Sequence, residues 1–127
     1  MLTLDIETTM NMDHIWCCGS HVTGEKGVRV SRNPMQLFDK INYEQVIVGH
    51  NIVNFDAPKL RELWHLVIHD HTLRDTLLMS RLWNPRLSGG HSLRAWGERL
   101  GYAKGDFSDY DGGLSDEMIE YCKRDVS

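Results

Sequence analysis

The sequence has 127 residues, of which 41% are hydrophobic and 25% are charged, and its formal net charge is -4 at pH 7. This length fits one domain, and the apolar fraction is enough for a hydrophobic core. The negative charge argues against a general electrostatic DNA binder, because such proteins carry a basic surplus that displaces counterions from phosphates. The apolar runs are too short to span a bilayer, and Met1 leads into the chain without a basic, apolar leader, so we expect a soluble protein that is not secreted. Three cysteines without a CxxC pair predict buried thiols in a reducing compartment.

The first half of the chain favours strands followed by alternating helices and strands. Residues 2–6, 15–22 and 27–31 are predicted strands, because they are rich in β-branched or apolar residues and turn signals lie between them. Pro34 suits the first turn of a helix over residues 35–41. A continuously apolar run at 45–49 is typical of a buried strand. The elements predicted next are a helix over 57–66, a short strand over 73–75 and a helix over 76–83 that ends before Asn84-Pro85.

The last third of the chain predicts two helices separated by a loop. Residues 92–100 are predicted to form a core helix, because Leu93, Trp96 and Leu100 recur at helical spacing between a capping Ser92 and Gly101. A polar loop is predicted over 105–113, and a final helix begins at 115–117. A meander followed by strand and helix alternation predicts an α/β fold with a mixed sheet of about five strands flanked by helices.

Four acids and a tyrosine form the strongest functional pattern in the sequence. Asp5 and Glu7 share a face if residues 2–6 form a strand, and Tyr121 and Asp125 share a face of the last helix. Two divalent ions about 4 Å apart can activate a water, stabilise a pentacoordinate phosphorus and assist the departing oxygen. Mg²⁺ and Mn²⁺ prefer oxygen ligands. We therefore expect two ions of Mg²⁺ or Mn²⁺, with Tyr121 orienting the attacking water and four acids as metal ligands: Asp5 as the bridge, Glu7, Asp56 and Asp125.

Each of these residues also has an ordinary structural interpretation. An Asp-x-Glu pair near an N-terminus is commonly a solvated strand end, and Asp56 precedes Ala57-Pro58 where a helix cap would sit. Tyr121 alone is usually a packing residue, and Asp125 alone is usually at the surface. Their joint occurrence, in order and each on the element that its role requires, favours the metal site.

Three segments of the sequence resemble the motifs of a known enzyme family. Asp5-Ile-Glu7, Asn51-x-x-x-Phe55-Asp56 and Tyr121-x-x-x-Asp125 are similar to the three motifs of DEDD 3'-5' exonucleases, in the subgroup with a tyrosine in the third motif (DEDDy). Gly49-His-Asn, residues 75–82, residues 91–101 and Lys104-Gly105 resemble the proofreading domain of podovirus-type family A phage DNA polymerases. The resemblance covers nearly the whole chain.

This resemblance implies a ribonuclease H-like (DnaQ-like exonuclease) fold and one 3'-5' exonuclease domain over residues 1–127, with no polymerase domain. The implied activity is metal-dependent hydrolysis of phosphodiester bonds from the 3' end of single-stranded DNA, which releases nucleoside monophosphates. It serves proofreading in DNA replication if a separately encoded DNA polymerase is a partner. No membrane is implied, the expected location is the cytoplasm (of the host if viral), and the oligomeric state is unknown.

The resemblance also implies substrate contacts. The backbone amide of Thr8 would meet the terminal 3' hydroxyl, and Met10 or Met12 would wedge against the last bases, although packing explains either methionine equally well. Phe55 would stack near a base, but a core position beside Asp56 is better supported. Asn51 either contacts substrate or braces its loop.

Other patterns are weaker. Asp75 is predicted to cap the following helix rather than to bind metal. The arginines of the middle segment either guide a phosphate backbone or form a solvated face; they are Arg81, Arg86, Arg94 and Arg99. A zinc site at His65, His69 and His71 is disfavoured, since a second ligand pair is missing.

Two functions remain as alternatives to a DNA exonuclease. One is a 3'-5' exoribonuclease, since the same metal chemistry serves both sugars. The other is a non-catalytic module that binds nucleic acid or a polymerase. The complete set of acids argues against this second alternative.

Overall fold

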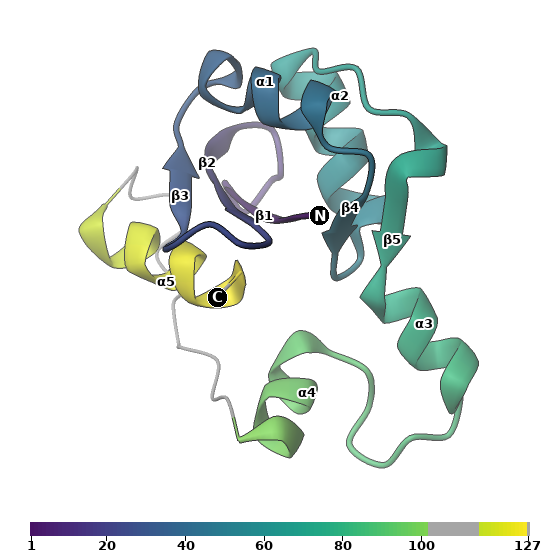
Figure 1. The fold of residues 1–127 in the computed structure, drawn as a ribbon. Coiled ribbons are helices and arrows are strands. Elements are labelled where there is room, and N and C mark those ends of the chain that lie inside the picture. Colours follow the sequence, from purple (N-terminus) through teal and green to yellow (C-terminus); the bar gives the residue numbers. More distant parts are fainter. Residues whose placement is uncertain (102–114, 127) are drawn as a thin grey trace.

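The protein is built around one mixed sheet of five strands in the order β3-β2-β1-β4-β5 (Figure 1). The structure is a computed structural model and describes residues 1–101 and 115–126, so the predicted loop over 105–113 lies outside it. Neighbours β1, β2 and β3 pair antiparallel, whereas β4 and β5 run parallel to β1. The strands are β1 (Leu2–Thr8), β2 (Ile15–Val22), β3 (Arg29–Ser31), β4 (Ile47–Gly49) and β5 (Leu73–Asp75). The predicted mixed sheet is confirmed.

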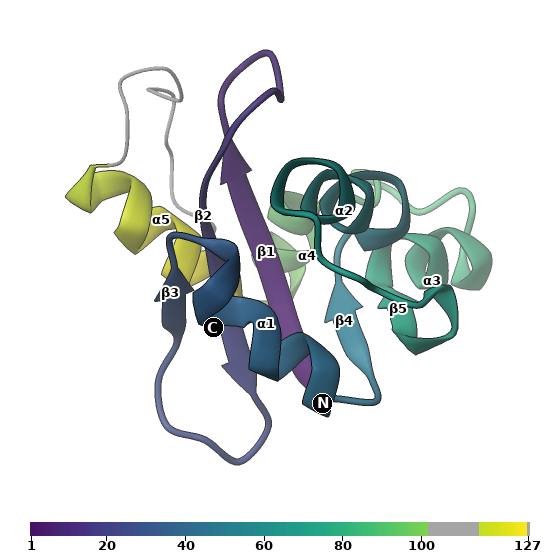
Figure 2. The same cartoon turned by 90° about the horizontal axis from the view of Figure 1, so that it is seen from above.

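Helices lie on both faces of this sheet (Figures 1 and 2). Two of them, α1 and α2, cover one face, and α5 packs on the opposite face. The helices are α1 (Pro34–Tyr43), α2 (Ala57–Trp64), α3 (Thr76–Trp83), α4 (Leu93–Leu100) and α5 (Asp116–Val126). Two shorter turns complete the described elements: a π-helical turn, η1 (Ile52–Asp56), and a 3-10 turn, η2 (Asp70–Thr72).

The alternation of β1 determines what each face of the sheet carries. Leu2, Leu4 and Ile6 are buried in the main core with residues of α1 and α2. Because successive side chains of a strand point to opposite faces, Asp5 and Glu7 lie on the other face, the one that α5 covers. The main core thus leaves the two acids on the side where the last helix packs.

A smaller core holds α5 against the sheet. Cys17 of β2 is buried with Met118 and Cys122 of α5, and Trp16 and Val30 pack around them. All three cysteines of the chain are buried and free, as the sequence predicts. This contact places α5 over the acid-bearing face of β1.

The predicted position of α4 is wrong, although its bounds are right. None of its residues is buried, and Leu100 is 74% exposed. Trp96 instead meets α3, where its ring lies 6.1 Å from that of Trp83 between centroids. Helical spacing identifies an apolar face, but it does not identify what that face packs against.

None of the described helices has the length and apolar character that crossing a membrane requires.

Candidate metal centre

Three acids from the two ends of the chain meet on one face of the sheet. Strand β1 supplies Asp5 and Glu7, and α5 supplies Asp125. One carboxylate oxygen from each lies within 4.8 Å of the others. Three carboxylates at this spacing suit a hard divalent cation such as Mg²⁺ or Mn²⁺, which takes oxygen ligands.

In the absence of a cation, the surroundings of Asp5 disfavour its ionised form. Burial raises the pKa of Asp5 well above its ordinary value, and the negative charges of Asp56, Glu7 and Asp125 raise it further. A hydrogen bond with the Asp125 carboxyl acts in the same direction. A bound dication reverses the local sign and favours the ionised acids, so the residues present fit a divalent metal.

Asp56 lies beside this group but is held differently. It is the last residue of η1 and is only 1% exposed, and its Oδ2 accepts a hydrogen bond from the amide of Ile6 at 3.0 Å. Burial is the main cause that raises its pKa to about 7, with the charge of Asp75 adding to it. Asp56 occupies the N-cap position of α2, but its side chain accepts no capping hydrogen bond, so the alternative interpretation as a side-chain cap is wrong. Its oxygens are not part of the three-acid group within 4.8 Å, and its role as a metal ligand stays a prediction.

Asp75 is the helix cap that the sequence predicts, and it has a second task that the sequence does not reveal. Its Oδ1 accepts from the amides of Leu77 at 2.9 Å and Leu78 at 3.3 Å, at the start of α3. The same carboxylate accepts from Asn51 at 2.9 Å and Val53 at 3.1 Å. Asp75 therefore fastens the turn that leads to Asp56.

Tyr121 is half-buried on α5, one turn before Asp125 and on the same face of the helix. This is where the sequence expects a side chain that orients water. Its role as the residue that orients the attacking water stays a prediction.

The residues predicted to contact substrate come from several elements. Thr8 is buried at the end of β1 and its hydroxyl donates to the carbonyl of Thr9, whereas Met10 is 62% exposed in the following turn. Asn51 has a left-handed backbone with φ of 65°. Phe55 is half-buried and packs against the main core, in line with its structural interpretation. Substrate contact by these residues remains a prediction.

A hollow of about 420 Å³ adjoins the acids and brings in residues that sequence reasoning did not assign to the site. Two of the three acids line it, together with the turn after β4, helix α3 and the start of α4. The lining residues are Asp5, His50, Asn51, Leu77, Arg81, His91, Ser92, Leu93 and Asp125. Most of these additional residues lie in segments 75–82 and 91–101, whose resemblance to the phage proofreading domain was the signal in the sequence that could have indicated them.

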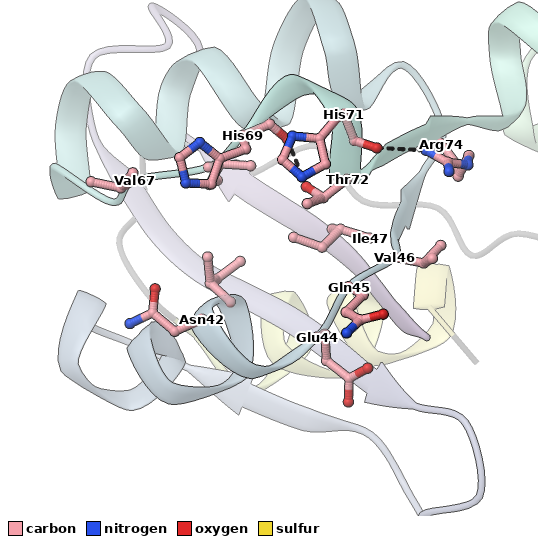
Figure 3. Close-up of a pocket in the computed structure, with 12 residues that line it drawn as sticks. Asn42, Glu44, Gln45, Val46, Ile47, Val67, His69, His71, Thr72 and Arg74 are labelled. Atoms are coloured by element: carbon pink, nitrogen blue, oxygen red, sulfur yellow. Dashed lines mark hydrogen bonds between the residues drawn. The ribbon is translucent and has the colours of Figure 1, made fainter.

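A different hollow of about 580 Å³ opens near the start of β4, away from the acids (Figure 3). His69 and His71 line it, and their rings stack 5.6 Å apart between centroids. Within residues 1–101 and 115–126, no group able to hold a metal ion includes either histidine. A zinc site here therefore has no support.

Comparison with known proteins agrees with this fold. The DNA-directed DNA polymerase of Escherichia phage T7 is 31% identical to the chain in an alignment that covers 64% of the chain and 17% of the polymerase, and that of Enterobacteria phage T3 matches equally. The chain thus spans about a sixth of the length of these curated relatives. No family model matches the sequence.

Solved structures show the same fold over 98% of the chain. Brucella melitensis NrnC with bound Mg²⁺ superposes with a TM-score of 0.74 at 19% identity, over 65% of NrnC. The family B DNA polymerase of Pyrobaculum calidifontis gives 0.71 at 14% identity, over 23% of that chain. The EXD2 exonuclease domain soaked in Mg and GMP gives 0.50 at 22% identity, over 68% of that domain.

The fold is the ribonuclease H-like fold of DnaQ-like exonucleases. The chain is thus similar in sequence to a part of two phage DNA polymerases, and it shares its fold with NrnC, a family B DNA polymerase and the EXD2 exonuclease domain.

Proposed function

We propose that the protein is a metal-dependent 3'-5' exonuclease that removes nucleoside monophosphates from the 3' end of single-stranded DNA. The observation that carries this proposal is the convergence of Asp5, Glu7 and Asp125 within 4.8 Å on a fold shared with exonucleases. The relationship to phage polymerases favours DNA as the polymer and proofreading as the role. Residues 1–127 would then form an exonuclease domain that acts with a DNA polymerase.

Four acids would hold the metal: Asp5, Glu7 and Asp125 directly, and Asp56 directly or through water. Two divalent ions, when bound, would activate the attacking water and stabilise the charge that develops on the phosphoryl and leaving oxygens. Tyr121 would hold the attacking water in line through its hydroxyl.

The remaining work of the chain is to position the strand. Thr8 would receive the 3' hydroxyl at the end of β1, and Asn51 lines the hollow beside the acids. Asp75 keeps the turn at Asn51 rigid through backbone hydrogen bonds. Positioning of this kind lowers the entropy cost of the reaction, because the phosphodiester is already aligned.

The experiment incubates 5'-labelled single-stranded DNA and RNA with Mg²⁺ or Mn²⁺ and separates the products by length. We expect stepwise shortening of DNA from the 3' end, which an Asp5→Ala, Glu7→Ala variant abolishes and an Asp39→Ala variant retains. Asp39 is an exposed acid on α1 and serves as the matched control.

Three other outcomes would contradict parts of this proposal. Shortening of RNA but not DNA would favour the exoribonuclease alternative. Cleavage of a circular strand would indicate an endonuclease. Failure to shorten either polymer under both metals would reject the enzyme and leave the non-catalytic module.

A further inference from the structure

The hollow beside the acids carries one strong cation on its wall. Its lining includes the acids Asp5 and Asp125 and, on α3, Arg81. Leu77 lines the same hollow one turn earlier, so α3 presents this face to it. A positively charged group and the candidate metal ligands therefore share one cavity.

Arg81 differs from the neighbouring arginines in what it contacts. Arg99 donates to the carbonyls of Ser88 and Gly90, at 2.6 Å and 2.5 Å, and lies 4.9 Å over the ring of Trp96. It thus holds the segment before α4 in place. Arg81 is exposed, and its guanidinium makes no hydrogen bond or ion pair with any residue of the described ranges 1–101 and 115–126.

Three hydrogen-bonded side chains connect α3, beside Arg81, to α4 and the segment before it. Trp96 Nε1 donates to Ser80 Oγ at 2.7 Å, and Ser80 Oγ bonds His91 Nδ1 at 2.6 Å. Ser80 directly precedes Arg81 on α3. His91 lies just before α4 and lines the hollow. These hydrogen bonds fix α3 relative to His91 and do not involve the Arg81 guanidinium.

The charge of this region fits a polyanion. Residues 76–101 contain four arginines and one acid, Glu98, although the whole chain has a formal charge of -4. Each linkage of a nucleic acid strand carries one negative charge. The scissile phosphate belongs at the acid cluster and its metal ions, so the next phosphate of the strand needs a separate cation.

We propose that Arg81 is a substrate-positioning residue, whose guanidinium binds the phosphate on the 5' side of the scissile phosphate in a single-stranded DNA substrate. A planar guanidinium suits this task, because it donates parallel hydrogen bonds to two phosphate oxygens. A hollow of about 420 Å³ falls in the range of typical ligand sites, about 300–1,000 Å³. The inference rests on the proposed function for the identity of the ligand.

The test measures binding rather than cleavage, so that it stands apart from the proposed activity. A 5'-fluorescent oligothymidylate, with a hydrolysis-resistant phosphorothioate at its 3'-terminal linkage, is titrated with protein in Mg²⁺ and followed by anisotropy. We expect Arg81→Gln to raise the Kd about tenfold and to reduce the slope of log Kd against log salt by about 1. Arg81→Lys should recover part of the affinity. Arg86→Gln, which removes an exposed arginine outside the hollow, should change the Kd less than about fivefold.

A neutral linkage locates the contact. One methylphosphonate at the linkage next to the terminal one should weaken binding to the wild type, but should not weaken binding to Arg81→Gln any further. The same group placed further toward the 5' end should affect the two proteins equally.

The inference would be overturned if the methylphosphonate next to the terminal linkage weakened binding equally in the wild type and in Arg81→Gln. An unchanged Kd for Arg81→Gln would also overturn it. These four measurements, two proteins with two strands, form a double-mutant cycle that gives the coupling between Arg81 and the phosphate. If the wild type shortens DNA and this coupling is absent, the inference alone fails. If the protein shortens no strand but the coupling is present, the proposed function fails and the phosphate contact stands. No binding to any strand rejects both.

Discussion

The carboxylate of Asp56 accepts a hydrogen bond of 3.0 Å from the backbone amide of Ile6. Ile6 lies between Asp5 and Glu7, so an acid that follows the fourth strand is attached to the strand that carries the first two acids. This single bond joins two of the three sequence motifs. It also satisfies an amide in a buried position, where an unpaired N–H is costly.

Substitution of Asp56 should separate its structural task from its functional one. In Asp56→Asn the amide oxygen can still accept from Ile6, whereas in Asp56→Leu it cannot, so the leucine variant should be less stable than the asparagine variant by about 1–3 kcal/mol. Both should lose activity, and Asp56→Asn should lower Mn²⁺ affinity by roughly 10- to 100-fold. Urea unfolding and Mn²⁺ titration measure the two effects. Equal stabilities of the two variants would show that the hydrogen bond matters little.

The same residue predicts how stability depends on pH. Burial raises the pKa of Asp56 to about 7 from the ordinary 3.8, so the folded protein holds this proton more tightly than the unfolded chain. Because the unfolded state binds fewer protons in this window, stability in chelator should fall as pH rises from about 4 to about 7 and then level off. Bound Mg²⁺ or Mn²⁺ should oppose the fall, since metal binds the ionised acids.

Thermal unfolding between about pH 5 and about pH 8, with chelator or with Mn²⁺, measures this dependence. Asp56→Asn is the control, because it keeps an acceptor for Ile6 but cannot titrate. A pH dependence in chelator identical to that of the wild type would contradict the assignment to Asp56.

How far the sequence predicted this structure depends on the range of the interactions involved. The meeting of Asp5 with Glu7 and of Tyr121 with Asp125 on shared faces follows from local periodicity, which a sequence displays directly. The cap at Asp75 is local too. Its bonds to Asn51 and Val53 cross more than twenty residues, and no local pattern reports them.

The misplaced helix α4 and the turn η1, which the sequence does not predict, have the same physical origin. The apolar spacing of α4 predicted a core helix, but Trp96 packs with Trp83 and donates to Ser80 at the end of α3. The entry to α2 begins as a π-helical turn because Gly49, Asn51 and Asp75 shape it from outside the segment. Tertiary contacts override local preference in both places.

Asp75 should prove more important for stability than an ordinary helix cap. Asp75→Ala removes an acceptor for four backbone amides at once, two at the start of η1 and two at the start of α3. We expect a loss of about 2–3 kcal/mol in the free energy of unfolding, above the roughly 1 kcal/mol typical of a cap. Urea unfolding measures it, with Asp39→Ala as the exposed control. A loss near that of a simple cap would mean that the bonds to Asn51 and Val53 contribute nothing.

The close approach of β4 to η1 predicts a further effect at Gly49. A Cβ at Gly49 would lie 2.8 Å from the Cβ of Ile52, which is fully buried and begins the turn that carries Asp56. Because this atom belongs to a stiff, branched side chain, the turn itself must shift in Gly49→Ala, at a cost of about 1–3 kcal/mol. The shift should also weaken Mn²⁺ binding, since it moves Asp56. Gly27→Ala is the contrast: its φ of 77° disfavours alanine but its surroundings are open, so stability should fall while Mn²⁺ affinity stays unchanged. An unchanged Mn²⁺ affinity in Gly49→Ala would show that Asp56 does not contribute to metal binding or that the turn yields without moving it, and a crystal structure of the variant would separate these two results.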